Sequence, residues 1–146
     1  MGEYGFSKDL DLDELAVVNT QGIVFEECQY KEMDANDFIT KFMQSRVAAE
    51  LDSMESGVFS AGASQLNRYA LELIGPVKKL NNKNRAFDDQ LYWVGYIYRY
   101  WAYLLGTPSN EIIKITPAKR ALQCYPAFHC MGNKEAIAQM ISIAKE

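Results

Sequence analysis

The chain has 146 residues, with 49% hydrophobic and 23% charged side chains, a balance typical of a single globular domain with a sizeable core. Its formal net charge of −4 and the lack of a continuous basic stripe argue against general binding to nucleic acid. The aromatic stretch 91–106 is shorter than the roughly 20 apolar residues that span a bilayer. It also carries Arg99 near its centre, so we expect no membrane segment.

Charge is unevenly distributed along the chain. Residues 1–58 hold 13 acidic and four basic side chains, whereas residues 59–146 hold six acidic and 11 basic ones. We expect a flexible tail over 1–8 and one helical domain over 9–146, acidic over 9–58 and basic-leaning over 59–146. The two parts either dock on each other or present an acidic and a basic lobe that steer a charged partner.

The chain has three cysteines, an odd number, and its first residues are acidic rather than apolar. This pattern does not resemble a secretory signal peptide. We therefore expect a reducing, cytoplasmic location in which Cys28, Cys124 and Cys130 are free thiols.

Two structures compete for residues 15–27. Gly22 and the β-branched pairs around it favour a hairpin with a turn over 19–22. The charge density on both sides and the helical character of the rest of the chain favour a helix. We favour the helix.

Helical periodicity then recurs along the chain. Apolar residues at helical spacing predict one helix over 34–54, capped by Asp34 or Asn36. Two glycines predict a loop over 55–64, and a second amphipathic helix follows over 64–74. Gly75 and Pro76 end or kink this helix, and the basic, polar segment 78–85 is predicted to be a loop.

An aromatic helix is predicted from about Phe87 to Leu105, closed by Gly106. Thr107-Pro108 and Thr116-Pro117 each place a capping hydroxyl before a proline and predict the starts of two short helices. Pro126 is expected to interrupt the second, and residues 133–146 form the last helix. The expected fold is all-α, with five to seven helices around the aromatic helix.

Three faces follow from turning the aromatic helix by about 100° per residue. A broad apolar arc predicts burial on two sides and comprises Trp93, Val94, Ile97, Tyr98, Tyr100, Trp101, Leu104 and Leu105. Gly95 and Ala102 form a groove that another helix backbone can approach. The third face is a stripe of Tyr92, Tyr96, Arg99 and Tyr103, and its residue types are enriched at interfaces. The stripe is either a partner-binding platform or a domain rim in which Arg99 pairs with an acid.

Catalytic and metal-binding patterns are weak. His129 is the only histidine, and its spacing from Cys124 and Cys130 matches no usual zinc site. His129 and Cys130, as neighbours, are expected to diverge rather than form a nucleophile pair. Asp88-Asp89 fit favourable charges in the first turn of a helix. We predict no metal and no cofactor, and the glycines near residue 60 lack the lysine and strand of a phosphate loop.

The run from Asp88 to Ile137 resembles a family of small, uncharacterised bacterial all-helical proteins. The shared motifs are Y-W-x-G-Y-x-Y-R-Y-W, here Tyr92 to Trp101, then G-x-x-S-x-E-I-x-K, here Gly106 to Lys114, and Y-x-x-[YF]-H, here Tyr125 to His129. Residues 38–52 resemble the leading helix of the family. Ala102, where a polar residue is expected, and Leu105 before Gly106 depart from the pattern. Members of this family are similar to proteins whose genes lie beside genes for ADP-ribosyltransferase-like toxins. The resemblance therefore implies an antitoxin or accessory role.

These observations predict a non-enzymatic protein-interaction module that binds a partner protein through Tyr92, Tyr96, Arg99 and Tyr103, with self-association as a further possibility. A nucleic-acid-binding regulator is the first alternative and would use a local patch of Lys78, Lys79, Lys83, Arg85, Lys114, Lys119 and Arg120. A small ligand-binding or enzymatic domain is the second alternative and would be built around His129, Arg99 and Tyr125.

Overall fold

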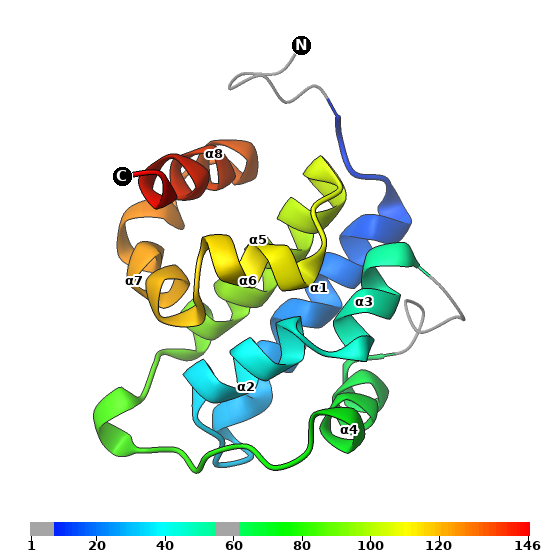
Figure 1. Cartoon of the computed structure of the whole chain (residues 1–146), viewed down its shortest axis with the longest axis vertical. Coiled ribbons are helices and arrows are strands. Elements are labelled where there is room, and N and C mark those ends of the chain that lie inside the picture. Colours follow the sequence, from blue (N-terminus) through cyan, green and yellow to red (C-terminus); the bar gives the residue numbers. More distant parts are fainter. Residues whose placement is uncertain (1–7, 55–61) are drawn as a thin grey trace.

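The computed structural model describes residues 8–54 and 62–146, and over these residues the fold is all-α, as predicted (Figure 1). Of the expected tail over 1–8 and loop over 55–64, residues 1–7 and 55–61 lie outside the described residues, and residues 63–64 are helical rather than part of a loop. The helices are α1 (Leu12–Glu26), α2 (Ala35–Met43), α3 (Arg46–Ser53), α4 (Ala63–Ile74), α5 (Asp88–Leu105), α6 (Ser109–Ile115), α7 (Ala118–Phe128) and α8 (Asn133–Ala144). Short 3₁₀ turns lie at Glu27–Gln29 and Asn82–Asn84.

Helix α1 settles the choice between helix and hairpin for residues 15–27. Its first turn is fixed by a capping box, in which Asp11 accepts a hydrogen bond from the Glu14 N–H at 2.8 Å and Glu14 accepts one from the Asp11 N–H at 3.0 Å. Gly22 lies within the helix rather than in a turn. Its small size serves packing, because a Cβ atom there would come within 2.7 Å of the Tyr92 ring.

Helix α5 is the central element, and α1 runs along it (Figure 1). The predicted groove at Gly95 is confirmed, because a Cβ atom there would lie only 2.6 Å from the carbonyl oxygen of Gln21. Gly22 and Gly95 therefore let two helix backbones meet almost directly. The acidic part of the chain thus docks on the basic-leaning part, and Asp9–Lys134 and Asp52–Arg99 ion pairs also join them.

The single helix expected over 34–54 is wrong, since two helices occupy this segment. Asp34 caps α2 by accepting a hydrogen bond from the Asp37 N–H at 3.0 Å, as predicted. Ser45 then adopts an extended backbone, and its hydroxyl accepts a hydrogen bond from the Ala48 N–H at 3.3 Å, which starts α3. Apolar residues on both sides of this break face the same core, so their periodicity does not reveal it.

The basic segment 78–85 contains no α-helix, as predicted, but it is not loose. Backbone hydrogen bonds of 2.8 Å join Asp34 to Lys78 and Leu80 to Glu32. The Lys78 N–H also donates to the Asp37 carboxylate at 2.8 Å. These bonds hold the segment against the start of α2.

Two expectations about prolines are wrong. Pro108 and Pro117 themselves occupy the N-cap positions of α6 and α7, and neither threonine hydroxyl caps a helix. Pro126 lies in the last turn of α7 without interrupting it. Proline cannot donate to the carbonyl four residues earlier, and the Gln90 side chain does so instead, at 2.7 Å from the Leu122 oxygen.

Candidate functional site

The predicted stripe on α5 is divided between the surface and the interior. Tyr92 and Tyr96 are half-buried at the surface, whereas Arg99 is fully buried and Tyr103 is 6% exposed. The prediction that Arg99 and Tyr103 face a partner is therefore wrong. The turn of the helix carries them under α3 and α6, where Arg99 forms the internal salt bridge that the sequence left open.

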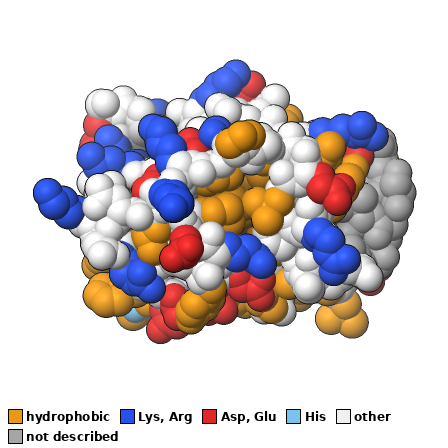
Figure 2. Space-filling model, turned by 90° about the horizontal axis from the view of Figure 1, so that it is seen from below, with side chains coloured by type: hydrophobic (Ala, Val, Ile, Leu, Met, Phe, Trp, Pro, Cys, Tyr) orange, Lys and Arg blue, Asp and Glu red, His pale blue; other side chains and the backbone are white. Residues whose placement is uncertain are grey.

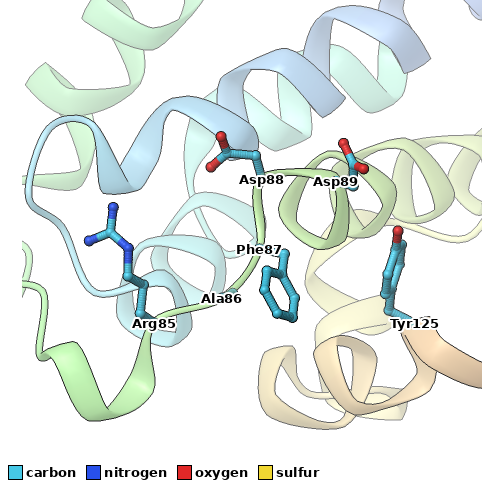
Figure 3. A pocket seen from close by; sticks show the side chains of 6 residues that line it. All are labelled: Arg85, Ala86, Phe87, Asp88, Asp89 and Tyr125. Atoms are coloured by element: carbon cyan, nitrogen blue, oxygen red, sulfur yellow. The ribbon is translucent and has the colours of Figure 1, made fainter.

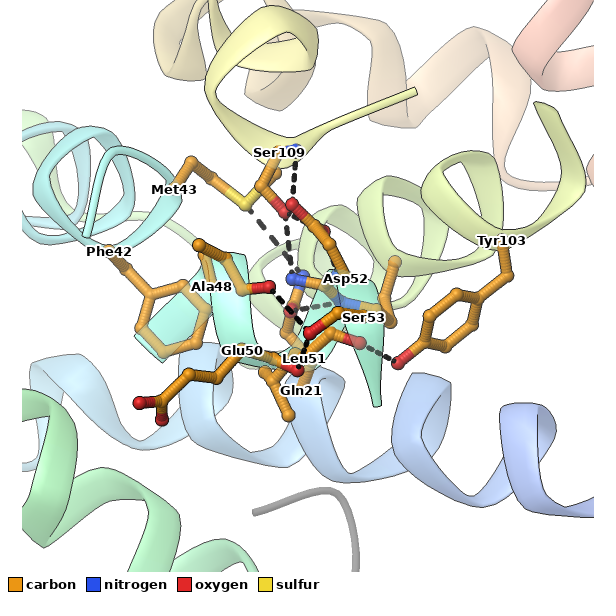
Figure 4. Close-up of polar contacts among 12 residues, drawn as sticks. Gln21, Phe42, Met43, Ala48, Glu50, Leu51, Asp52, Ser53, Tyr103 and Ser109 are labelled. Atoms are coloured by element: carbon orange, nitrogen blue, oxygen red, sulfur yellow. Dashed lines mark hydrogen bonds and ion pairs between the residues drawn. The ribbon is translucent and has the colours of Figure 1, made fainter. Parts of the chain in front are cut away.

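Arg99 is matched by polar groups from three other helices (Figure 4). Its Nε donates to the Gln21 side-chain oxygen at 2.8 Å, and one terminal nitrogen donates to the Ser109 hydroxyl at 2.9 Å. The other terminal nitrogen forms an ion pair with Asp52. Asp52 also accepts from Ser109, at 2.8 Å from the backbone N–H and 2.6 Å from the hydroxyl. We call Gln21, Asp52, Arg99 and Ser109 the Arg99 network.

The Arg99 guanidinium is closed to solvent. Arg99 and Ser109 are 0% and 1% exposed, and only Asp52 reaches the wall of an adjacent cavity of about 310 Å³. The Tyr103 ring covers the guanidinium, with 5.5 Å between the guanidinium carbon and the ring centre, and its hydroxyl donates to the Leu51 carbonyl at 2.7 Å. Burial raises the pKa of Tyr103 to about 12, so Tyr103 stays a neutral donor. The network joins α1, α3, α5 and α6 rather than forming a reaction centre.

The exposed part of α5 carries a different row of side chains, which we call the tyrosine ridge: Tyr92, Tyr96 and Tyr100. The ring centres are 5.9 Å apart for Tyr92 and Tyr96 and 6.2 Å apart for Tyr96 and Tyr100, with the second pair stacked. All three are half-buried. Burial is the main reason that the pKa of Tyr92 and the pKa of Tyr100 lie above their ordinary value. The sequence prediction placed Tyr100 in the buried arc and so missed it.

His129 belongs to a separate aromatic group on α7. Its ring stacks on Tyr125 with 4.2 Å between centres, and Tyr125 meets Trp93 edge-on at 6.0 Å. The His129 Nδ1 donates to the Tyr125 carbonyl at 2.6 Å, while Nε2 lies 3.4 Å from the Cys130 sulfur. The expectation that these two neighbours diverge is therefore wrong. The Arg99 network is formed with α1, α3 and α6, so the predicted grouping of Arg99 with His129 and Tyr125 is not formed.

A cavity of about 450 Å³ opens at the N-terminal end of α5 (Figure 3). We call it the carboxylate pocket, and it is lined by Arg85, Ala86, Phe87, Asp88, Asp89 and Tyr125. Phe87 is 78% exposed. Asp88 accepts a hydrogen bond from the Tyr30 hydroxyl. The pKa of Glu26 is raised, first by burial and then by the neighbouring charges of Asp88 and Asp89.

The predicted basic patch is only partly assembled. Lys83, Arg85 and Lys119 line one hollow of about 210 Å³, so the segment 78–85 and the start of α7 do meet. All seven predicted basic residues are exposed. On the face in Figure 2, however, blue lysine and arginine side chains alternate with red acidic ones, and no unbroken basic band crosses it.

Several site residues could not be recognised from the sequence. Asp52 and Ser109 lie 47 and 10 positions from Arg99 and carry no motif. Phe87 was expected only as the start of a helix. The one available signal was its unsuitability there, because an N-cap position favours a small polar side chain.

The three cysteines are free, as predicted, with Cys130 exposed and the other two buried. No three His, Cys, Asp or Glu side chains among residues 8–54 and 62–146 are arranged to hold a metal ion. No helix in the same part of the chain is long and apolar enough to cross a membrane. Comparisons of the chain with protein-family models, with curated proteins and with solved structures find no match.

Proposed function

We propose that the protein is a non-enzymatic interaction module that binds a partner protein through the tyrosine ridge. The single observation that carries this proposal is the row of three half-buried tyrosines on the central helix α5. Tyrosine buries a large area with only two side-chain torsions and keeps a polar tip, so it is favoured at binding hot spots. Tyr92 and Tyr96 keep their predicted role, and Tyr100 replaces Arg99 and Tyr103.

The ridge is held in place before any partner arrives. Tyr92 packs against Gly22 and its hydroxyl donates to the Asn19 side chain. Tyr96 lies between the other two rings. Rings that are already ordered lose little side-chain entropy on binding, which favours affinity.

The resemblance of residues 88–137 to proteins encoded beside ADP-ribosyltransferase-like toxins supports an antitoxin or accessory role. The proposed partner is then such a toxin, encoded by the adjacent gene. The test is co-expression with the product of that gene, followed by affinity purification on a tag carried by this chain.

We expect the wild-type chain to retain the partner and the Tyr96→Ala/Tyr100→Ala variant to lose it. Leu73→Ala is the matched control, because Leu73 is also an exposed apolar side chain but lies on α4, away from the ridge. Retention of the partner by a folded Tyr96→Ala/Tyr100→Ala chain would remove the ridge from the interface. A mass in solution of twice that of the chain, lost in the same variant, would make the partner a second copy.

Nucleic-acid binding is the second candidate function. It is favoured by Lys83, Arg85 and Lys119, which line one hollow. It is opposed by the mixture of acidic and basic side chains on the face in Figure 2. Binding through phosphate contacts weakens steeply with salt, because each contact releases counterions. Binding of a duplex or single-stranded oligonucleotide that is absent, or flat between 50 and 200 mM salt, rejects this candidate.

A further inference from the structure

We propose that the carboxylate pocket binds the guanidinium group of an arginine side chain presented by a partner protein. The inference rests on the proposed function, which supplies the partner, and adds the chemistry of one contact. The pocket combines two aromatic walls, Phe87 and Tyr125, with the carboxylates of Asp88 and Asp89 (Figure 3).

The Phe87 ring is available for stacking, whereas the Tyr125 ring lines the pocket and is already stacked on His129. The Phe87 side chain is 78% exposed, so it contributes little to the core. Phenylalanine also cannot cap α5, because its side chain accepts no hydrogen bond from the first turn. Phe87 and Tyr125 line the same pocket, and in the view of Figure 3 both rings lie below Asp89. An exposed ring beside a second ring provides a surface for a flat group.

The charge of the pocket is not neutralised within the described part of the chain. None of Glu26, Asp88 and Asp89 forms an ion pair with a lysine or arginine of residues 8–54 and 62–146, although six other such pairs are present there. Arg85 lines the pocket but points away from Tyr125 and Asp89 in Figure 3. Arg85 brings a positive charge to the pocket but forms no ion pair with Asp88 or Asp89, so both carboxylates can accept a cation from another molecule.

Arginine fits this combination better than lysine. Its guanidinium is planar, so it stacks on aromatic faces, and its paired N–H groups donate to a carboxylate in a bidentate manner. A lysine ammonium is a compact, strongly hydrated charge that gains less from stacking. The tyrosine ridge begins one helical turn from Asp88, at Tyr92, so one partner can reach both features.

The test uses the full chain and hexa-arginine as the probe, followed by NMR shifts of backbone amides. We expect shifts centred on residues 85–89 and 125. We expect binding at least about tenfold tighter than that of hexa-citrulline, which is flat but neutral, and tighter than that of hexa-lysine. Phe87→Ala and Asp89→Asn should each weaken binding by about three- to tenfold, whereas Arg85→Ala should strengthen it by removing a like charge.

Asp9→Asn is the matched control, because Asp9 is an exposed acid at another place on the surface, paired with Lys134. An equal loss of affinity in Asp9→Asn and Asp89→Asn would mean general attraction to an acidic protein and would overturn the proposal. So would equal binding of hexa-citrulline, or shifts centred elsewhere. If an oligonucleotide binds more tightly than hexa-arginine, and Arg85→Ala weakens that binding, the carboxylate pocket is a phosphate site instead.

The two proposals can fail separately. If Phe87→Ala and Asp89→Asn chains keep the adjacent gene's product and do not bind hexa-arginine differently from wild type, the pocket proposal is wrong and the interaction module stands. If hexa-arginine binds as expected but no protein partner is retained, the proposed function is wrong and the pocket remains a cation site.

Discussion

The two ends of α5 differ in whether their charged side chains are paired within the protein. Toward its C-terminal end, Arg99 is fully buried, and each of its three side-chain nitrogens donates to a residue of another helix. At its N-terminal end, Asp88 and Asp89 stand beside an exposed phenylalanine and form no ion pair within the described chain. Charge that is matched internally stabilises one arrangement of helices. Charge that is left unmatched at the surface is available to another molecule.

Replacement of Arg99 is expected to have the largest effect. Arg99→Ala leaves the Asp52 carboxylate without its charge partner and the Ser109 hydroxyl without the donor that it accepts from. Breaking a buried pair in this way costs about 3 kcal/mol or more of unfolding free energy. Chemical denaturation measures the loss. Lys114→Ala is the control, because its ion pair with Glu111 is exposed on both sides and is worth less than about 1 kcal/mol. Equal losses in the two variants would show that the Arg99 network does not stabilise the fold.

Gly95→Ala disturbs the same network through Gln21. Gln21 donates to the Gly95 carbonyl at 3.0 Å while accepting from Arg99, and an added Cβ would push the Gln21 backbone away. We expect a loss of about 1–3 kcal/mol from overpacking, although alanine is the better helix former by about 1 kcal/mol. Gly132→Ala, where nothing lies within 4 Å of the added Cβ, should cost at most about 1 kcal/mol. A larger loss of unfolding free energy in Gly132→Ala than in Gly95→Ala would mean that α1 moves freely on α5.

The sequence predicted only the local features of α5, those that depend on spacing along one helix. Spacing along one helix identified α5, the groove at Gly95 and the favourable first-turn acids. It also placed Arg99 and the tyrosines on one face, which is correct as helix geometry. A helix face becomes interior or surface only through what packs on it, and Asp52 and Ser109 reach Arg99 through tertiary contacts that no spacing reveals.

Helix boundaries were missed for a similar reason. The break between α2 and α3 depends on one hydroxyl, that of Ser45, within an unbroken apolar pattern. Conversely, Pro126 fails to end α7 because Gln90, from another helix, supplies the missing donor. In both places one side-chain hydrogen bond outweighs the pattern on which the prediction depended.

Phe87→Ala should separate stability from recognition at the open end of α5. Because the side chain is 78% exposed, we expect the unfolding free energy to change by no more than about 0.5 kcal/mol, while hexa-arginine binding weakens. Denaturation and the NMR titration on the same sample measure both. A loss of stability comparable to that of Gly95→Ala would show that the ring is a structural part of the fold, and the contrast between the two ends of α5 would disappear.

The smallest effect concerns the proton affinity of Glu26. Its pKa lies above the ordinary value, mainly through burial and then through Asp88 and Asp89. A folded-state pKa above the unfolded one means that the protonated form is favoured by folding. The resulting stability is present below the unfolded pKa and is lost as pH rises through the folded pKa. Asp88→Asn/Asp89→Asn should lower the pKa of Glu26 part of the way, since burial remains. Carboxyl-carbon NMR titration measures this shift, and an unchanged value would mean that the three carboxylates do not act as one negative site.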